Sequence, residues 1–344
     1  MNWINDTIKQ PSADHHQQAS NRQAILTKPP GSLGELENVA VRLAALQQRD
    51  TPSLDAAWIS IFAADHGIAE EGVSAFPQEV TKAMLGNFLA GGAAINALAN
   101  LQAAQLEVIN VGVKQCDEGF EGLIQQSVAE GTANFTQQAA MTAQQLSQAL
   151  DVGRDAVQRA AVSRSDIFIG GEMGIANTTS ASALACAILN LPADKLVGAG
   201  TGVNAQGIRK KQQVIETALK HHQQQLNSPL SILQYLGGFE IAALVGAYIH
   251  CGQIGMPVIV DGFISSTAAL IAVNIQPNLA AWLFYGHQSE EAGHQHVLAA
   301  LKAYPLLNLN MRLGEASGAA LALSILRAAC QLHQQMATFE EAGI

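Results

Sequence analysis

Short runs of apolar residues alternate along this chain with longer segments whose apolar residues recur every three to four positions. The runs predict strands buried on both faces, and the periodic segments predict amphipathic helices. Buried strands that alternate with helices are typical of βαβ units and a mainly parallel sheet, so we predict an α/β fold. The predicted strands span residues 58–64, 106–113, 166–169, 257–260 and 281–284. The predicted helices span residues 33–48, 78–101, 142–161, 178–191, 207–225, 232–251, 266–273, 289–303 and 317–333.

Helical patterns also occupy both ends of the chain. The first fifty residues read as helices before the first predicted strand, and a last helix closes the chain. The chain between these two ends contains no low-complexity linker and no short-period repeat. We therefore predict a small helical domain built from residues 1–55 and about 317–344, with residues 56–316 forming an α/β body that carries the active-site crevice.

The composition is apolar and acidic. Of 344 residues, 49% are apolar and 13% are charged, a balance that excludes a disordered chain. The 18 Lys and Arg against 28 Asp and Glu give a net charge of −10, which argues against nucleic acid because phosphate affinity comes mostly from basic side chains. The chain also lacks a basic amphipathic helix for anionic lipid. We expect neither a nucleic-acid nor a membrane partner.

Targeting and redox features are sparse. The first residues show neither a basic region nor an apolar core, so we expect no secretory signal. The apolar stretches 241–249 and 316–329 are short or interrupted, against the ~18 residues that a membrane span needs. The cysteines lie far apart without a CxxC pair, and we interpret them as buried thiols in a reducing compartment. The predicted localisation is cytoplasmic.

Most predicted strands end in glycine or in a polar cluster. In open parallel sheets, ligands bind in the crevice outside the carboxyl ends of the strands. Repetition of this feature at five strand ends predicts one ligand site there. The residues concerned are Asp65-His66-Gly67, Gly112, Gly170-Gly171-Glu172, Asp261-Gly262 and Gly286-His287.

The segment 168–180 runs from a strand through Gly170-Gly171-Glu172-Met173-Gly174 into Asn177-Thr178-Thr179-Ser180. Small residues let a ligand approach the backbone closely, and the free N–H groups of the following helix suit an anion such as phosphate. It is neither a Rossmann fingerprint nor a P-loop, because no Lys-Ser/Thr follows the glycines. The alternative is an ordinary strand-to-helix turn, but a carboxylate at Glu172 between glycines favours a functional role.

Further anion donors follow along the chain. A second glycine loop, residues 198–204, leads to Arg209-Lys210-Lys211. A lysine there supplies a point charge for phosphate; the alternative is that the three basic residues form a solvated helix face. The hydroxyl-rich segment 265–267 and the segment 286–296 are two more helix starts. In the latter, Glu290 and His294 have ligand spacing, but the H-E-x-x-H order and a third ligand are missing. We therefore favour Ser289 as an anion donor and expect no metal.

Two segments suggest acid–base chemistry. In Met311-Arg312-Leu313-Gly314-Glu315 a lone carboxylate stands between small residues before an apolar helix. Glu315 is either a general base or an acidic residue that complements the helix dipole, worth only ~0.3–1 kcal/mol. Asp65-His66 is a second candidate pair, and Phe76 and Met84 after it are candidates for a flat pocket or for core.

Taken together, these segments resemble one family, the nicotinate-nucleotide:dimethylbenzimidazole phosphoribosyltransferases of cobalamin lower-ligand synthesis. The matching segments occur in the family's order from residue 28 to about 330, so the resemblance covers almost the whole chain. They are Lys28-Pro29-Pro30-Gly31-Ser32-Leu33-Gly34, Ala64-Asp65-His66-Gly67, Glu71-Gly72-Val73-Ser74, Gly170-Gly171-Glu172-Met173-Gly174, Val260-Asp261-Gly262-Phe263 and Met311-Arg312-Leu313-Gly314-Glu315.

The resemblance implies transfer of phosphoribose from nicotinate mononucleotide to dimethylbenzimidazole, by a homodimer with a Rossmann-like α/β body and a small helical domain. It places the catalytic base on Glu315 and a second active-site carboxylate on Glu172. The implied phosphate lysine is Lys211, with Lys210 as its neighbour and rival. The other implied substrate-binding residues are Gly174, Thr178, Ser180 and Ser289 for phosphate, and Phe76, Met84, Met173 and Leu313 for the benzimidazole.

Two residues depart from the family pattern. Ala176 stands where a glycine is expected, and Asn204 stands where an acidic residue is expected. They leave the reaction class unchanged and affect only the loop contacts. The proton affinity of Glu315 is open at this level, because a helix N-terminus lowers a carboxylate's pKa whereas the apolar neighbours Met311 and Leu313 raise it.

The residue types fit this reaction. The leaving pyridinium becomes neutral as it departs, so it needs no strong acid and no metal or redox cofactor. The attacking benzimidazole needs one positioned carboxylate to take its ring proton. The alternatives are another nucleotide-using α/β enzyme, such as a nucleosidase or sugar kinase, and a non-catalytic protein that binds a flat heterocycle.

Overall fold

The computed structural model describes residues 2–116, 120–200 and 202–344, and within these ranges seven strands form one parallel sheet in the order β3-β2-β1-β4-β5-β6-β7. Met1 and Thr201, which fall in the predicted helical domain and the second glycine loop, lie outside the described residues. The strands are β1 (Ala57–Ala64), β2 (Gln105–Gly112), β3 (Ile124–Gln125), β4 (Ile167–Met173), β5 (Val258–Val260), β6 (Leu283–His287) and β7 (Pro305–Leu307). This order contains that of Rossmann folds, so the predicted α/β class is confirmed.

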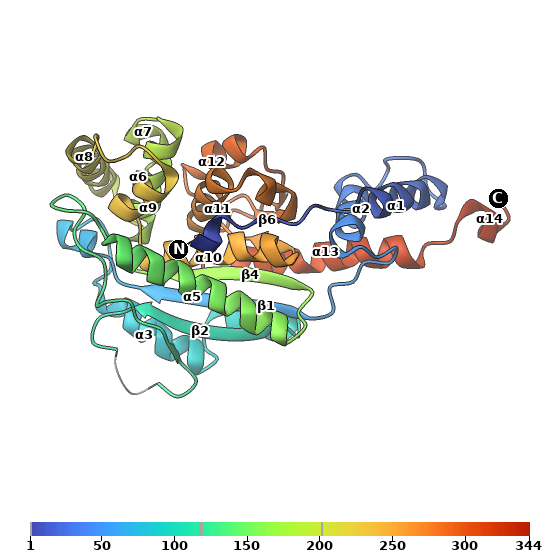
Figure 1. The fold of residues 1–344 in the computed structure, drawn as a ribbon, viewed down its shortest axis with the longest axis horizontal. Coiled ribbons are helices and arrows are strands. Elements are labelled where there is room, and N and C mark those ends of the chain that lie inside the picture. The colour runs from blue at the N-terminus through green and yellow to red at the C-terminus, as the bar shows by residue number, and fades with distance from the viewer. Residues whose placement is uncertain (1, 117–119, 201) are drawn as a thin grey trace.

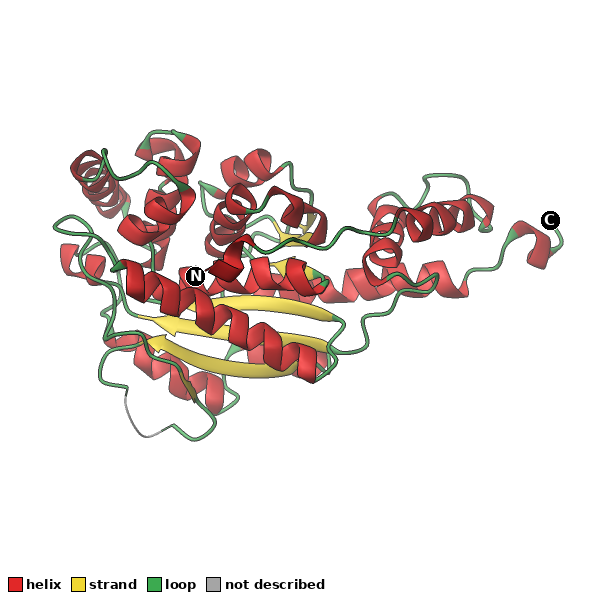
Figure 2. Cartoon of the chain, viewed as in Figure 1, coloured by secondary structure: helices red, strands yellow, loops and turns green. Residues whose placement is uncertain are grey.

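Helices cover both faces of the sheet (Figures 1 and 2). The main helices are α1 (Ala13–Ile25), α2 (Glu35–Gln47), α3 (Glu79–Leu89), α4 (Ala94–Leu101), α5 (Ala143–Val162), α6 (Asn177–Leu189), α8 (Ala205–His221), α9 (Pro229–Leu236), α10 (Phe239–Ile254), α11 (Phe263–Ile275), α12 (His294–Leu301) and α13 (Ser317–Gln335). Shorter helices are η1 (Asn2–Asn5), η2 (Gly67–Glu71), α7 (Ala193–Leu196), η3 (Pro277–Trp282) and α14 (Phe339–Ala342).

The direction of each strand crossover decides which face a helix covers. The chain moves one way across the sheet from β1 to β2 through α3 and α4, and the other way from β4 to β6 through α10 and α11. Because such crossovers are right-handed, the two sets lie on opposite faces. Helix α5 packs along α10, and α13 returns to the face of α4. Strand β1, between β2 and β4, is buried along its whole length, as its apolar sequence predicts.

The N-terminal helices α1 and α2 pack on each other, and α2 packs along α13 (Figure 1) and reaches β6 through Arg42, which donates to the Leu283 carbonyl at 2.8 Å. A bridge between Leu26 and Thr338 and a hydrogen bond from Arg22 Nε to the His333 carbonyl, at 2.7 Å, tie the two ends of the chain together. Residues 2–9, by contrast, lie against the α/β body: the Trp3 indole donates to Asp151 on α5, and the Trp282 indole donates to the Lys9 carbonyl.

The predicted boundaries differ from the structure at several places. The single helix expected at 78–101 is two, α3 and α4, because the chain breaks at Gly91, with φ +79°, and Gly92. Strand β4 continues beyond residue 169 to Met173 because Gly170 and Gly171 pair with β1. The strand expected at 281–284 begins later because Pro277 opens a 3-10 turn. Two short edge strands, β3 and β7, carry no clear pattern in the sequence.

One described segment, Glu79–Leu101, is long and apolar enough by length and composition to cross a membrane. Only 28% of its most apolar window is buried, and the structure divides it into α3 and α4. This segment differs from 241–249 and 316–329, the apolar stretches whose lengths are compared above with a membrane span.

Candidate active site

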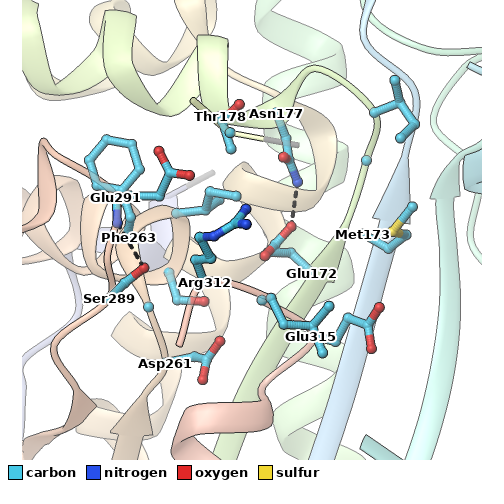
Figure 3. Close-up of a pocket in the computed structure, with 18 of the residues that line it drawn as sticks. Glu172, Met173, Asn177, Thr178, Asp261, Phe263, Ser289, Glu291, Arg312 and Glu315 are labelled. Atoms are coloured by element: carbon cyan, nitrogen blue, oxygen red, sulfur yellow. Dashed lines mark hydrogen bonds between the residues drawn. The ribbon is translucent and has the colours of Figure 1, made fainter. Parts of the chain in front are cut away.

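A pocket of about 280 Å³ opens at the carboxyl ends of β4, β5 and β6 (Figure 3). Parallel strands end at the same edge of a sheet, so residues far apart in sequence meet there. Eight of the eleven predicted catalytic and substrate-binding residues line it: Phe76, Glu172, Met173, Gly174, Thr178, Ser289, Leu313 and Glu315. The predicted crevice at the strand ends is therefore present.

Glu172 lies at the end of β4 and is almost completely buried. Asn177, in the first turn of α6, donates a short hydrogen bond from Nδ2 to Glu172 Oε2 (Figure 3). Burial raises the pKa of this carboxyl well above its usual range, and the negative charges of Glu240 and Asp261 raise it further. Burial therefore favours the protonated form of Glu172, in opposition to the hydrogen bond from Asn177, which favours the charged form.

Glu315 is presented by a strained turn. Gly314, Glu315 and Ala316 all have positive φ, at +85°, +60° and +63°, and α13 begins directly after them. Left-handed backbone at a non-glycine residue costs roughly 1–2 kcal/mol, so two such residues in succession need support from the surrounding structure. The Ser317 hydroxyl supplies part of it by donating to the Gly314 carbonyl at 2.7 Å.

The proton affinity that the sequence left open is decided by burial. Desolvation raises the pKa of Glu315 from its ordinary 4.5 to about 7, and the negative charge of Asp261 adds to the effect. Glu315 lies before the N-cap of α13, so it does not sit in the helix's first turn, where the dipole would lower its pKa. A carboxylate with a pKa near neutrality suits a general base.

A cation lies at one side of the pocket. Lys211 is 1% exposed, and its Nζ donates to Thr178 Oγ1 at 3.0 Å. Burial lowers its pKa to about 8, against the opposing charge of Glu291. Gly200 closes this corner: a Cβ there would lie 2.9 Å from Lys211 Nζ and 2.7 Å from Thr178 Oγ1. Lys210 is exposed and lies beside Gly72, so the structure brings Lys211 to the pocket residues and leaves Lys210 outside.

Apolar side chains frame the pocket mouth. Phe76 and Leu313 line the pocket and remain 53% and 56% exposed, which is unusual for side chains of this size. Met173 lines the pocket from the end of β4. A flat ring held between such side chains would cover them, while its polar edge would face the carboxylates deeper in the pocket.

Relatives with curated names match this chain over nearly its full length. The nicotinate-nucleotide–dimethylbenzimidazole phosphoribosyltransferase of Pseudomonas fluorescens strain SBW25 is 54% identical over 342 residues, covering 99% of this chain and 97% of the relative. The enzyme of that name from Pseudomonas aeruginosa strain LESB58 is 52% identical over 344 residues, covering 100% and 98%. The chain belongs to this family. Consistently, a family model described as phosphoribosyltransferase matches residues 8–344.

The fold of this phosphoribosyltransferase agrees with solved structures. The crystal structure of CobT from Thermus thermophilus is similar at a TM-score of 0.92 and 45% identity, covering 96% of this chain and 99% of that one. The expectation of an enzyme of this family is confirmed.

Three predicted site residues of this phosphoribosyltransferase lie outside the pocket lining. Lys211 reaches it through Thr178, as described above. The Ser180 hydroxyl instead donates to the Leu236 carbonyl on α9, so it serves packing between helices and does not face the pocket. Met84 lies on α3, where its sulfur accepts from Asn87 Nδ2 at 3.9 Å, and it does not line the pocket.

The loop around Ser289 also differs from expectation. The predicted helix at 289–303 begins only at His294, so Ser289 is not at a helix N-terminus. Its backbone N–H donates to His294 Nδ1 at 2.8 Å, and its hydroxyl accepts from the Glu291 N–H at 3.3 Å. Ser289 can therefore meet a ligand through its hydroxyl proton and not through free helix N–H groups.

Ala176 and Asn204, the two residues that depart from the family pattern, both lie at the N-caps of helices. Ala176 takes a positive φ of +78° as the N-cap of α6, the conformation that favours glycine. The Asn204 side chain caps α8 by accepting from the N–H groups of Gln206 and Gly207 at 3.1 and 3.0 Å. An amide oxygen thus makes the capping contacts that a carboxylate would make.

Five pocket residues of this phosphoribosyltransferase with carboxylate, amide, imidazole or guanidinium side chains were given no individual role from the sequence: Asn177, Asp261, His287, Glu291 and Arg312. Two of them carried a signal, since Asp261 and His287 directly end or follow strands. The other three lie in segments that the sequence singled out for a neighbouring residue. Among the described residues, no group of three or more His, Cys, Asp or Glu is arranged to hold a metal ion.

Proposed function

We propose that this phosphoribosyltransferase moves phosphoribose from nicotinate mononucleotide to dimethylbenzimidazole, giving α-ribazole 5'-phosphate and nicotinate in cobalamin nucleotide-loop assembly. The observation that carries the proposal is the Glu315 carboxylate, with a pKa of about 7, in a pocket that joins an apolar mouth to a buried lysine. The names of the relatives support it.

In this proposal a ring nitrogen of the benzimidazole attacks the anomeric carbon of the ribose. The bond from that carbon to the pyridinium nitrogen breaks, and its electron pair neutralises the leaving nicotinate ring. Glu315 takes the proton from the other ring nitrogen of the benzimidazole, so the product ring is uncharged. A base in this role typically contributes roughly 10²–10⁴-fold in rate.

The remaining residues bind and orient the substrates. Lys211 and the hydroxyls of Thr178 and Ser289 receive the phosphate, because a net charge of −10 repels a phosphorylated substrate and local donors must hold it. Phe76, Met173 and Leu313 hold the flat base. Glu172 accepts a hydrogen bond from Asn177, and burial raises its pKa, so we assign it a hydrogen-bonding role on the wall of the pocket.

Incubation with nicotinate mononucleotide and dimethylbenzimidazole, with nicotinate release followed by chromatography, tests the function directly. Release that requires both compounds supports the proposal. Release that is independent of the benzimidazole indicates a nucleosidase. Tight binding of the benzimidazole without turnover indicates a heterocycle-binding protein, and transfer of phosphate from ATP indicates a kinase.

We also propose that the enzyme is a homodimer in the cytoplasm. In the apolar segment Glu79–Leu101, 28% of the most apolar window is buried within one chain and Leu101 stays 72% exposed, and an exposed apolar surface favours association. Light scattering after size exclusion should give twice 36.1 kDa. Cys186, Cys251 and Cys330 are buried thiols, which is typical of a reducing compartment. Fractionation of cells that produce the protein tests the location.

A further inference from the structure

Asp261 directly follows β5 and is buried on the floor of the pocket (Figure 3). Its Oδ1 accepts a hydrogen bond from the backbone N–H of Ala319 at 2.8 Å. Its carboxylate also accepts from the backbone N–H groups of Gly318 and Gly262. Two of these donors, Gly318 and Ala319, belong to the first turn of α13.

Helix α13 has no side-chain cap of its own. Its N-cap residue is Ala316, which has no side-chain acceptor for the N–H groups of the first turn. Such groups are left without partners inside the helix and need an acceptor from elsewhere. Asp261 supplies it from another strand end, through charge-assisted hydrogen bonds that are stronger than those of a neutral cap.

The turn held in this way is the one that presents Glu315. Glu315 and Ala316 both have positive φ, and α13 starts one residue later. A strained turn keeps its geometry only if both sides are fixed. Gly171 of β4 confines one side, since a Cβ there would meet the Ala316 backbone nitrogen at 2.9 Å, and Asp261 fixes the helix on the other side.

We propose that Asp261 is a positioning residue for Glu315: its carboxylate anchors the first turn of α13, which holds the Glu315 turn in place, and its negative charge faces the pocket that contains the Glu315 carboxylate. The anchoring rests on the fold alone, whereas the effect on catalysis rests on the proposed function of Glu315 as base.

Titratable or charged side chains from several elements line the pocket around Glu315. Glu172 lines the pocket from β4, Asp261 from the end of β5, His287 from the end of β6, and Arg312 from the same loop as Glu315. Of these, the Asp261 charge is the one that raises the pKa of Glu315, after burial. His287 Nε2 lies 3.8 Å from Asp261 Oδ1 and lowers the pKa of Asp261, in opposition to burial.

Two variants separate anchoring from charge. Asp261→Asn keeps an oxygen acceptor for the Ala319 N–H and removes the negative charge. The acidic limb of its kcat profile should move to lower pH by at least about 0.5 unit, because a like charge beside Glu315 is gone. Asp261→Ala removes the acceptor as well, and kcat should fall about tenfold or more because the base is displaced, with a smaller change in KM for the nucleotide. Glu107→Gln is the matched control: it removes a carboxylate on β2 that pairs with Arg159 at 2.8 Å outside the pocket lining, so its acidic limb should stay close to that of the wild type.

Hydrogen exchange provides a readout that does not depend on catalysis. The amides of residues 317–320 should exchange at least about tenfold faster in Asp261→Ala than in the wild type, and Asp261→Asn should restore most of the protection. Unchanged exchange in Asp261→Ala overturns the anchoring. An acidic limb that stays in place in Asp261→Asn overturns the electrostatic half. If Glu315→Gln turns over normally while exchange in Asp261→Ala is accelerated, the base assignment fails and the anchoring stands.

Discussion

Gly314 lies against Glu172 so closely that a Cβ on Gly314 would be 2.7 Å from Glu172 Oε1. The turn that presents Glu315 therefore packs directly on the second carboxyl of the pocket, although 142 positions separate the two residues (314 − 172). This contact joins the end of β4 to the start of α13.

Replacement of Gly314 by alanine should damage the pocket. Gly314 has φ +85°, so alanine adds roughly 1–2 kcal/mol of backbone strain to the contact with Glu172. We expect Gly314→Ala to lower kcat/KM at least about tenfold, from displacement of both carboxyls. Gly91→Ala is the control, because Gly91 has φ +79° with no atom within 4 Å of a Cβ. It should lower the melting temperature and leave kcat/KM unchanged; equal losses of activity in both variants would contradict the role of the contact.

Glu315→Gln should lose at least about two orders of magnitude in kcat while it still binds both substrates. In the wild type, kcat should fall as pH drops below about 7, where Glu315 becomes protonated. A stopped assay across pH 5–9 together with calorimetric titration of the nucleotide measures both effects. Near-normal turnover of the variant would remove Glu315 from the mechanism.

The same variant should gain stability at high pH. Because the pKa of Glu315 is about 7 in the folded chain and its ordinary value is 4.5, the folded chain binds more protons than the unfolded chain between these values. Stability from this group is therefore complete below pH 4.5 and is lost as pH rises through 7. With screening by solvent at the pocket mouth, we expect Glu315→Gln to be about 1–2 kcal/mol more stable than wild type at pH 8. At pH 4 the melting temperatures should agree; a gain at pH 4 equal to that at pH 8 would contradict the titration.

Replacement of the Glu172 carboxyl by an amide should have little effect on activity. Burial raises the pKa of this carboxyl well above its usual range and so favours the uncharged form, which an amide resembles in shape and polarity. Glu172→Gln should retain kcat/KM within about tenfold, whereas Glu172→Ala leaves Asn177 without its acceptor and should lose roughly 100-fold. If Glu172→Gln is as inactive as Glu172→Ala, the carboxyl works in its charged form.

Lys211 is buried and Lys210 is exposed, so replacement of each should change KM for the nucleotide to a different extent. Lys211→Met should raise KM for nicotinate mononucleotide roughly 10–100-fold, the size of one charge-assisted hydrogen bond. Lys210→Met, on the exposed side of α8, should change it less than about threefold. Since the pKa of Lys211 is about 8, KM of the wild type should rise between pH 7 and 9 as the ammonium group loses its proton. A larger effect at Lys210 would reverse the assignment.

A chelator should leave the enzyme active. The leaving pyridinium becomes neutral when the bond to ribose breaks, so the reaction has no diphosphate whose charge a divalent ion must neutralise. Initial rates with and without excess EDTA should agree. A loss of activity that Mg²⁺ restores would show that the phosphate is bound through a metal.

Local pattern alone predicted much of this protein. The strands β1, β2, β4 and β5 are read from the sequence because strands buried on both faces are mostly apolar, with few polar residues such as Ser60 and Asn110 among them. Glycines and acids at the strand ends predicted the site, because parallel strands bring their carboxyl ends to one edge. The ordered motifs around Glu172 and Glu315 then identified the family.

The tertiary structure decided what depends on neighbours distant in sequence. Burial and the charge of Asp261 set the pKa of Glu315, since desolvation cannot be read from adjacent residues. The Ser180 hydroxyl donates to the Leu236 carbonyl and so does not face the pocket. The Ser289 N–H donates to His294 and is not available to a ligand. The sequence thus determined which residues could meet at the pocket, and packing determined which of them face it and in which protonation state.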